Sequence, residues 1–125
     1  MMAEDAFIKA LRKRRQITIS VIGRRTGRTI SLPVWFVSEE DTLWLLPVNG
    51  SNTHWYRNLL SNPTIKIKVE KERRTFNASA LKGVRSVRQV IQRFRDKYTP
   101  DVIARLYPGP LNAAVKVSIR ARITR

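Results

Sequence analysis

The sequence contains no cysteine and a single histidine. Without cysteine, the chain has no disulfide bond, thiolate zinc site, iron–sulfur cluster or cysteine nucleophile. A serine triad would have to use His54, and a metal site would have to be built from the nine carboxylates. Three of these carboxylates, at positions 39–41, fall in a predicted hairpin turn, so we expect neither a triad nor a metal site. If the protein is an enzyme, its reactive atom therefore belongs to a bound cofactor.

Long apolar runs are also missing. No run of about 18 apolar residues occurs, which argues against a transmembrane helix. In residues 1–15 the charged positions follow a short apolar part instead of preceding it, which is not the order of a secretory signal. We therefore expect a cytoplasmic location.

Acidic residues are scarce relative to basic ones. The chain has 25 lysines and arginines against 9 aspartates and glutamates, which gives a net charge of +16. A field of this strength concentrates polyanions near the protein. The net charge thus predicts an anionic partner, and it does not choose between nucleic acid, an anionic membrane surface and a phosphorylated small molecule.

The 125 residues predict a single domain, residues 1–125, with one hydrophobic core. Apolar residues at helical spacing or in strict alternation mark the elements. The expected helices cover 3–15, 54–60, 84–98 and 100–107, and the expected strands cover 17–22, 30–36, 42–48, 65–70, 75–82 and 115–123, with turns at 38–41 and 72–74. Mostly sequential strands with short connections indicate the α+β class, with an antiparallel sheet closed as a small, partly open barrel and flanked by helices.

Three local signals refine this prediction. Pro33 lacks an amide hydrogen, so it favours a strand edge or a bulge. Residues 42–48 are apolar on both faces, and we expect both faces to be covered. Asn52 is the expected N-cap of the helix at 54–60.

Gly23 and Gly27 bracket a basic loop that contains Arg24, Arg25 and Thr26 and is followed by Arg28. Exposed backbone amides and three guanidinium groups in one tight turn predict an anion site. The alternative is a solvated basic hairpin turn. The loop lacks the Lys-Ser/Thr ending of a Walker motif and is not a dinucleotide fingerprint.

A second stretch, residues 49–63, carries a polar loop into a helix N-terminus, another place for an anion or a polar ring edge. Trp55 and Asn58 are three residues apart and share one face of this helix. The alternative places Trp55 and Leu59 in the core and Asn58 on the surface, with His54 as a structural residue.

The order of these two stretches resembles the deazaflavin-dependent nitroreductase family. The resemblance covers about residues 17–81, and its most specific part is the Trp-x-x-Asn-Leu-x-x-Asn-Pro segment from Trp55 to Pro63. It implies a split β-barrel of the flavin-reductase type with an N-terminal helix. It also implies coenzyme F420, an 8-hydroxy-5-deazaflavin with an anionic tail, which exchanges hydride with a small organic substrate.

The same resemblance assigns the cofactor-binding residues. The anionic tail would bind the basic loop, namely Arg24, Arg25, Thr26, Gly27 and Arg28. The ring would lie near the strand-to-helix loop and the following helix, namely Pro47, Val48, Asn49, Gly50, His54, Trp55 and Asn58. The segment before the first strand is short for the family, so the substrate class does not carry over.

No proton donor is evident from the motifs. Tyr98 or Tyr107 would serve as a proton donor or as a wall of the substrate site, because a phenol offers both an aromatic face and a hydroxyl group. The alternative role for each tyrosine is core packing.

Two other functions compete with this interpretation. A split barrel of this kind would also accept FMN or another cofactor. A nucleic-acid-binding module is supported by the eleven basic residues between Lys66 and Lys97. It is less favoured, because the aromatic residues are not spaced as a base-stacking platform. For the oligomeric state, we favour a homodimer over a monomer.

Overall fold

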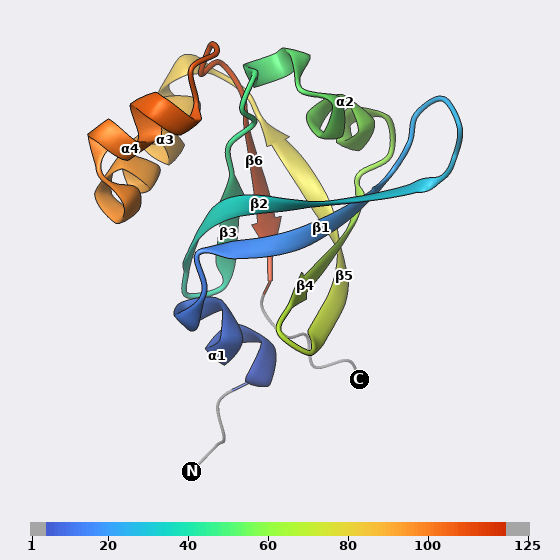
Figure 1. Cartoon of the computed structure of the whole chain (residues 1–125). Helices are drawn as coiled ribbons and strands as arrows, with labels where there is room; N and C mark the ends of the chain where they lie inside the picture. Colours follow the sequence, from blue (N-terminus) through green and yellow to red (C-terminus); the bar gives the residue numbers. More distant parts are fainter. Residues whose placement is uncertain (1–4, 120–125) are drawn as a thin grey trace.

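A closed barrel of six antiparallel strands forms the centre of the computed structural model, which describes residues 5–119 (Figure 1). Around the barrel the strands follow the order β1-β2-β3-β6-β5-β4, and β4 pairs with β1 to close it. The strands are β1 (Gln16–Ile22), β2 (Thr29–Glu39), β3 (Thr42–Leu45), β4 (Thr64–Val69), β5 (Glu72–Leu81) and β6 (Ala114–Ser118). The helices are α1 (Ala6–Lys13), the 3-10 turn η1 (Gly50–Asn52), α2 (His54–Ser61), α3 (Val84–Tyr98) and α4 (Pro100–Leu106).

The expected α+β class and antiparallel barrel are confirmed. Alternating apolar residues of the strands point inward, as Ile17, Ile19 and Val21 do on β1, and they fill the barrel core. Helix α1 packs Phe7 and Leu11 into this core at one end, and α2 lies at the other end (Figure 1).

A second core lies outside the barrel, beneath α3 and α4. Leu43 and Leu45 of β3 belong to the barrel core, whereas Leu46 and the partly buried Trp44 pack with the second core. Both faces of this apolar segment are therefore covered, as its sequence predicts. The spacing of Val87, Ile91, Phe94 and Tyr98 along α3 creates the stripe that packs here.

Several predicted boundaries are corrected. The turn expected at 72–74 lies at Glu70 and Lys71, and Glu70 adopts a positive φ of 56° there. The N-cap of α2 is Thr53 instead of Asn52, because residues 50–52 form the 3-10 turn η1. The third strand ends at Leu45, before the predicted limit of 48. The sixth strand ends at Ser118, and the part of its prediction at 120–123 lies outside the described residues.

The strand β2 belongs to both halves of the barrel. Its first part, Thr29–Trp35, pairs with β1, and its last part, Phe36–Glu39, pairs with β3. The other edge of the first part has no strand partner among residues 5–119. Pro33 lies in this part, which confirms the predicted edge position and is the reason that proline is tolerated here.

Candidate cofactor-binding site

On one side of the closed barrel, β2 and the chain beyond β3 diverge, and we call the region between them the barrel opening. Pairing between these strands ends at Phe36 and Leu45, so the first part of β2 and the segment 46–52 separate from that point. The predicted cofactor-binding residues come from three segments near this opening: the β1–β2 loop, the loop between β3 and α2, and α2 itself. A direct hydrogen bond joins α2 to the β1–β2 loop, and Thr53, the N-cap of α2, is hydrogen-bonded to Asn49 of the loop before it.

Arg24 connects the β1–β2 loop to α2. Its backbone N donates to Asn58 Oδ1 at 3.1 Å, and its Nη1 donates to the same oxygen at 2.8 Å. Nη1 also lies 3.4 Å from the His54 carbonyl oxygen, and Nη2 lies 3.4 Å from His54 Nδ1. The structure therefore brings together Arg24, His54 and Asn58. Asn58 is only 3% exposed, so the alternative that places it on the surface is wrong.

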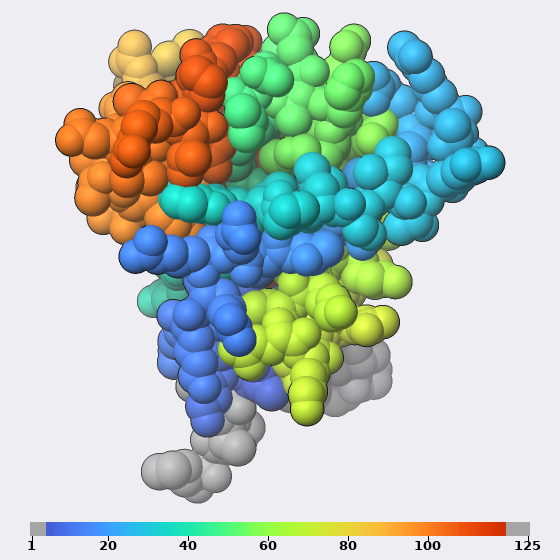
Figure 2. Space-filling model, in the orientation of Figure 1, coloured from blue at the N-terminus to red at the C-terminus, as the bar shows by residue number. Residues whose placement is uncertain are grey.

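The remainder of the loop is a tight turn. Gly23 N donates to Arg28 O at 2.8 Å, Gly27 N donates to Gly23 O at 2.9 Å, and Arg28 N donates to Thr26 Oγ1 at 3.1 Å. Gly27 has a φ of +73°, a conformation that other residues rarely adopt. Arg25 and Arg28 are exposed, and within residues 5–119 their guanidinium groups have no hydrogen-bond or ion-pair partner. In Figure 2 this loop projects from the body of the molecule.

The loop Pro47–Gly50 is supported from below by the segment before β6. Gly50 has a φ of +57°, and a Cβ there would collide with Asn112 Oδ1 and come within 2.5 Å of the Pro110 carbonyl oxygen. The same Asn112 Oδ1 accepts a hydrogen bond from Ser51 N at 2.9 Å. Asn112 is thus a supporting residue that the sequence pattern did not reveal, because 61 residues separate the two partners.

Thr53 also holds this loop. Its Oγ1 accepts from Asn49 N at 2.8 Å, so it makes no side-chain cap to α2. Pro47 and Gly50 are buried, whereas Val48 is 40% exposed and Asn49 is exposed. On the other side of the opening, Ile30 of β2 is 43% exposed. Two apolar side chains thus remain accessible on the two segments that diverge.

Trp55 is 5% exposed and belongs to the barrel core with Leu59. Its indole therefore packs against the interior, as the core interpretation of this residue predicts. His54, one residue earlier, is exposed and points toward Arg24.

Tyr98 lies at the base of the β1–β2 hairpin. Its Oη donates to the carbonyl oxygens of Phe36 and Arg15, the latter at 3.0 Å, and accepts from Phe36 N at 3.3 Å. Burial raises the pKa of Tyr98 to about 12. Tyr107 is also buried in the second core, with its ring edge-on to Phe94 at 6.1 Å, and burial raises its pKa above the usual value.

The two tyrosines and the basic loop are not brought together. Tyr98 stacks on Trp35 with ring centroids 4.5 Å apart, and Trp35 pairs with Gln16 at the base of the hairpin. The hairpin ends six residues further on, at the pair Ile22 and Thr29. At about 3.3 Å per residue, this distance is roughly 20 Å.

A groove of about 520 Å³ lies beside Tyr98, between the hairpin base and α4. Its lining includes Trp35, Lys97, Tyr98, Val102, Arg105 and Leu106. Although Lys97 is exposed overall, its Nζ donates to the Phe36 carbonyl oxygen at 2.8 Å and lies 4.0 Å from the Phe36 ring centroid. Burial of the ammonium group, with the nearby charge of Arg15, lowers the pKa of Lys97 to about 8. Neither Trp35 nor Lys97 lies in a sequence motif that points to a functional role.

Within residues 5–119, no group of three or more histidine, aspartate and glutamate side chains is placed to hold a metal ion. No helix in the same range has the length and hydropathy needed to cross a membrane.

The geometry agrees with a class of split-barrel proteins. A structure of an F420-H2 dependent reductase, FDR-A, superposes with a TM-score of 0.65 at 19% identity, covering 84% of this chain and 95% of that chain. HutZ, a heme storage protein from Vibrio cholerae, gives 0.71 at 19% identity, covering 98% and 93%. A putative 5-nitroimidazole antibiotic resistance protein from Bacteroides thetaiotaomicron gives 0.70 at 16% identity, covering 97% and 83%. At these identities the likeness shows the fold, which is the split barrel.

The family is shown by sequence. The model of the F420H2-dependent quinone reductase family matches residues 3–103, most of the chain. The chain therefore belongs to this family, and the resemblance to deazaflavin-dependent reductases is confirmed. A comparison with curated proteins gave no significant match.

Proposed function

We propose that the protein is an oxidoreductase that binds coenzyme F420 along the barrel opening and exchanges hydride with a small organic substrate. Membership of a family of F420H2-dependent reductases supports this function. The observation that carries the site is the pair of exposed guanidinium groups, Arg25 and Arg28, on a loop that Arg24 fastens to α2.

The residues present fit the coenzyme. Arg25 and Arg28 have no carboxylate partner within residues 5–119, so an anionic tail meets cations that are not already neutralised. Ile30 and Val48 offer exposed apolar surface for a ring and exclude water from its faces. The distance of roughly 20 Å from the loop to the groove favours a long coenzyme over FMN, which carries a single phosphate.

Each side chain has a separate task. When bound, the coenzyme supplies a hydride from C5 of its ring. Asn58 and His54 hold Arg24, and through it the loop, in one position. Trp35 and Tyr98 form the wall against which an organic substrate packs. Lys97, with a pKa of about 8, holds a proton at neutral pH beside this wall.

Tyr98 acts in this proposal as a wall and not as the proton donor. Its hydroxyl proton is shared between two backbone carbonyl oxygens, and its pKa of about 12 opposes release of that proton. Tyr107 acts as a packing residue of the second core. We propose the same location and oligomeric state as the sequence predicts, a cytoplasmic protein that forms a homodimer; one solved split-barrel relative is described as a domain-swapped dimer.

The test compares two double variants by titration with oxidised coenzyme F420, a tail-less 8-hydroxy-5-deazaflavin and FMN. Arg25→Ala/Arg28→Ala removes two cations from the loop. Arg73→Ala/Arg85→Ala removes two exposed cations elsewhere and is the matched control for net charge. We expect the loop variant to weaken coenzyme F420 binding by about tenfold or more and the control to change it by less than about twofold.

The tail-less deazaflavin distinguishes the contribution of the tail to binding from the contribution of the ring. Its affinity should change little in the loop variant, because it has no anionic group for Arg25 or Arg28. Equal weakening by both double variants, or equal losses for the coenzyme and the tail-less ring, would contradict the tail assignment. Tighter binding of FMN than of coenzyme F420 would contradict the choice of cofactor.

A further inference from the structure

The outer face of the sheet formed by β2, β1 and β4 carries a groove outside the barrel opening, which shares Arg15 and Trp35 with the groove beside Tyr98. It has a volume of about 740 Å³. No helix lies over this face among residues 5–119, because α1 and α2 close the two barrel ends and α3 and α4 cover another side (Figure 1). The lining comprises Arg14, Arg15, Gln16, Ile17, Thr18, Pro33, Trp35, Lys68, Val69 and Glu70. We call this the outer-sheet groove.

The outer-sheet groove is positively charged. Its charged groups are three cations, Arg14, Arg15 and Lys68, and one carboxylate, Glu70. Arg14 Nε lies 3.2 Å from Glu70 Oε2, so this pair is neutral at the rim. The side chains of Arg15 and Lys68 have no hydrogen-bond or ion-pair partner within residues 5–119. Two cations without such partners therefore line the groove, Arg15 near Trp35 and Lys68 further along, and both favour an anionic ligand.

One end of the groove presents a flat aromatic surface. Trp35 is half-buried and stacks on Tyr98, which fixes the plane of the indole. Pro33 lies two residues before it on the same face of β2 and adds a second flat apolar surface. Gln16 and Thr18 of β1 lie between these rings and Lys68, and they provide hydrogen-bonding groups along the floor.

The strand register gives the spacing of the two ends. Trp35 lies beside Gln16 on β1, and Lys68 lies beside Thr18 on the other side of β1. Their backbones are therefore about 10 Å apart across two strand spacings and about 7 Å apart along the strands. The Lys68 side chain lines the groove, so its charged group lies closer to Trp35 than the backbone does. The remaining distance suits a molecule with an aromatic ring at one end and a phosphate at the other.

We infer that the outer-sheet groove binds a nucleotide, with its base against Trp35 and Pro33 and its phosphate at Lys68. The groove volume lies within the usual range for small-molecule sites, about 300–1,000 Å³. Stacking on an aromatic side chain accepts any base, so the site selects for a nucleotide phosphate and not for a base sequence.

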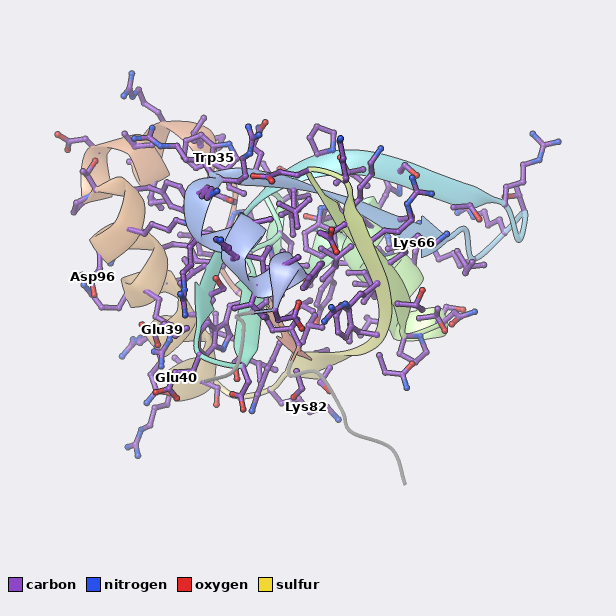
Figure 3. The ribbon with its side chains drawn as sticks, turned by 90° about the horizontal axis from the view of Figure 1, so that it is seen from below. Trp35, Glu39, Glu40, Lys66, Lys82 and Asp96 are labelled. Carbon is purple, nitrogen blue, oxygen red and sulfur yellow. The ribbon has the colours of Figure 1, made fainter. Side chains whose placement is uncertain are left out.

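Lys66 is a matched control for Lys68, because it lies two residues away on the same strand and the same face. Both are exposed, but Lys66 does not line the groove. In Figure 3, Trp35 lies where the hairpin base meets the two C-terminal helices, and Lys66 lies toward the other end of the hairpin. Lys66→Ala therefore controls for the loss of one positive charge from the sheet.

The experiment is a calorimetric titration of the full chain with AMP, adenosine and inorganic phosphate. AMP should bind more tightly than either fragment, because it alone occupies both ends of the groove. We expect Lys68→Ala to weaken AMP binding by about tenfold and Lys66→Ala to change it by less than about twofold. Equal effects of the two variants would overturn the proposal, as would the absence of AMP binding to the unmodified chain.

A second arm distinguishes a free nucleotide from a strand of nucleic acid. A single-stranded oligonucleotide that binds while AMP does not would overturn the nucleotide site in favour of binding along a phosphate backbone. The melting temperature of Lys68→Ala, expected to equal that of Lys66→Ala, shows that the fold is intact. Lys68 has no part in the proposed F420 site, so coenzyme titration of the same variant reports on that function separately.

Discussion

The two ends of the β1–β2 hairpin use polar groups in opposite ways. At the tip, one arginine is hydrogen-bonded to a buried asparagine, and the neighbouring arginines are left without partners in the described chain. At the base, the Tyr98 hydroxyl is bonded on all sides by backbone atoms of β2 and of Arg15. Polar side chains whose hydrogen bonds hold the fold thus lie close to polar side chains that are available to bind a ligand. Residue type alone does not distinguish the two groups.

The largest expected effect concerns the tip. Asn58→Leu removes the buried acceptor of Arg24, which leaves the Arg24 backbone N without its partner and leaves Nη1 only the longer contact with the His54 carbonyl oxygen. We expect a loss of about 2–3 kcal/mol in the free energy of unfolding, measured with urea, and faster amide exchange at residues 23–28. Asn77→Leu on the exposed face of β5 is the control. If both variants lose the same stability, the Arg24–Asn58 contact does not hold the loop.

A smaller effect is expected at the base. Tyr98→Phe removes a hydroxyl that bonds three backbone groups, which should cost about 1–2 kcal/mol of stability. Tyr107→Phe is the matched control, and it should cost less than about 0.5 kcal/mol because its hydroxyl has no hydrogen-bond partner within residues 5–119.

The same pair of variants tests the role of Tyr98 in the reaction. If Tyr98 acts only as a wall of the substrate site, the Tyr98→Phe variant should oxidise the reduced coenzyme at a rate within about twofold of the unmodified protein. A fall of about a hundredfold or more would identify Tyr98 as the proton donor and remove the contrast between the two ends.

The smallest effect concerns pH. The pKa of Lys97 is about 8 in the folded chain, below its ordinary value of 10.5, so the unfolded chain binds more protons between these values. Stability should therefore rise from pH 8 toward pH 10. Above pH 10 the raised pKa of Tyr98, about 12, acts in the opposite direction, because the unfolded chain loses that proton first. Urea unfolding of Lys97→Met should lack the rise between pH 8 and 10, and an unchanged rise would show that another group causes it.

Periodicity predicted the barrel because strands and helices bury one face at a fixed repeat, and α3 begins and ends at the predicted residues. The basic loop was also predictable, since Gly23 and Gly27 mark its turn locally. The bond from Arg24 to Asn58 was not, because 34 residues separate the partners and their approach depends on how α2 lies against β1. The acceptors of Tyr98 were hidden for the same reason, as they are carbonyl groups of a distant strand.

The two separate cores divide the chain into two parts that pack around different sets of residues. No residue of α3 or α4 contributes to the core inside the barrel. Substitutions on these helices can therefore reshape the groove beside Tyr98 while the barrel, the basic loop and the Arg24–Asn58 contact keep their packing. The helical pair is therefore a part of the chain that can vary in sequence without repacking the barrel.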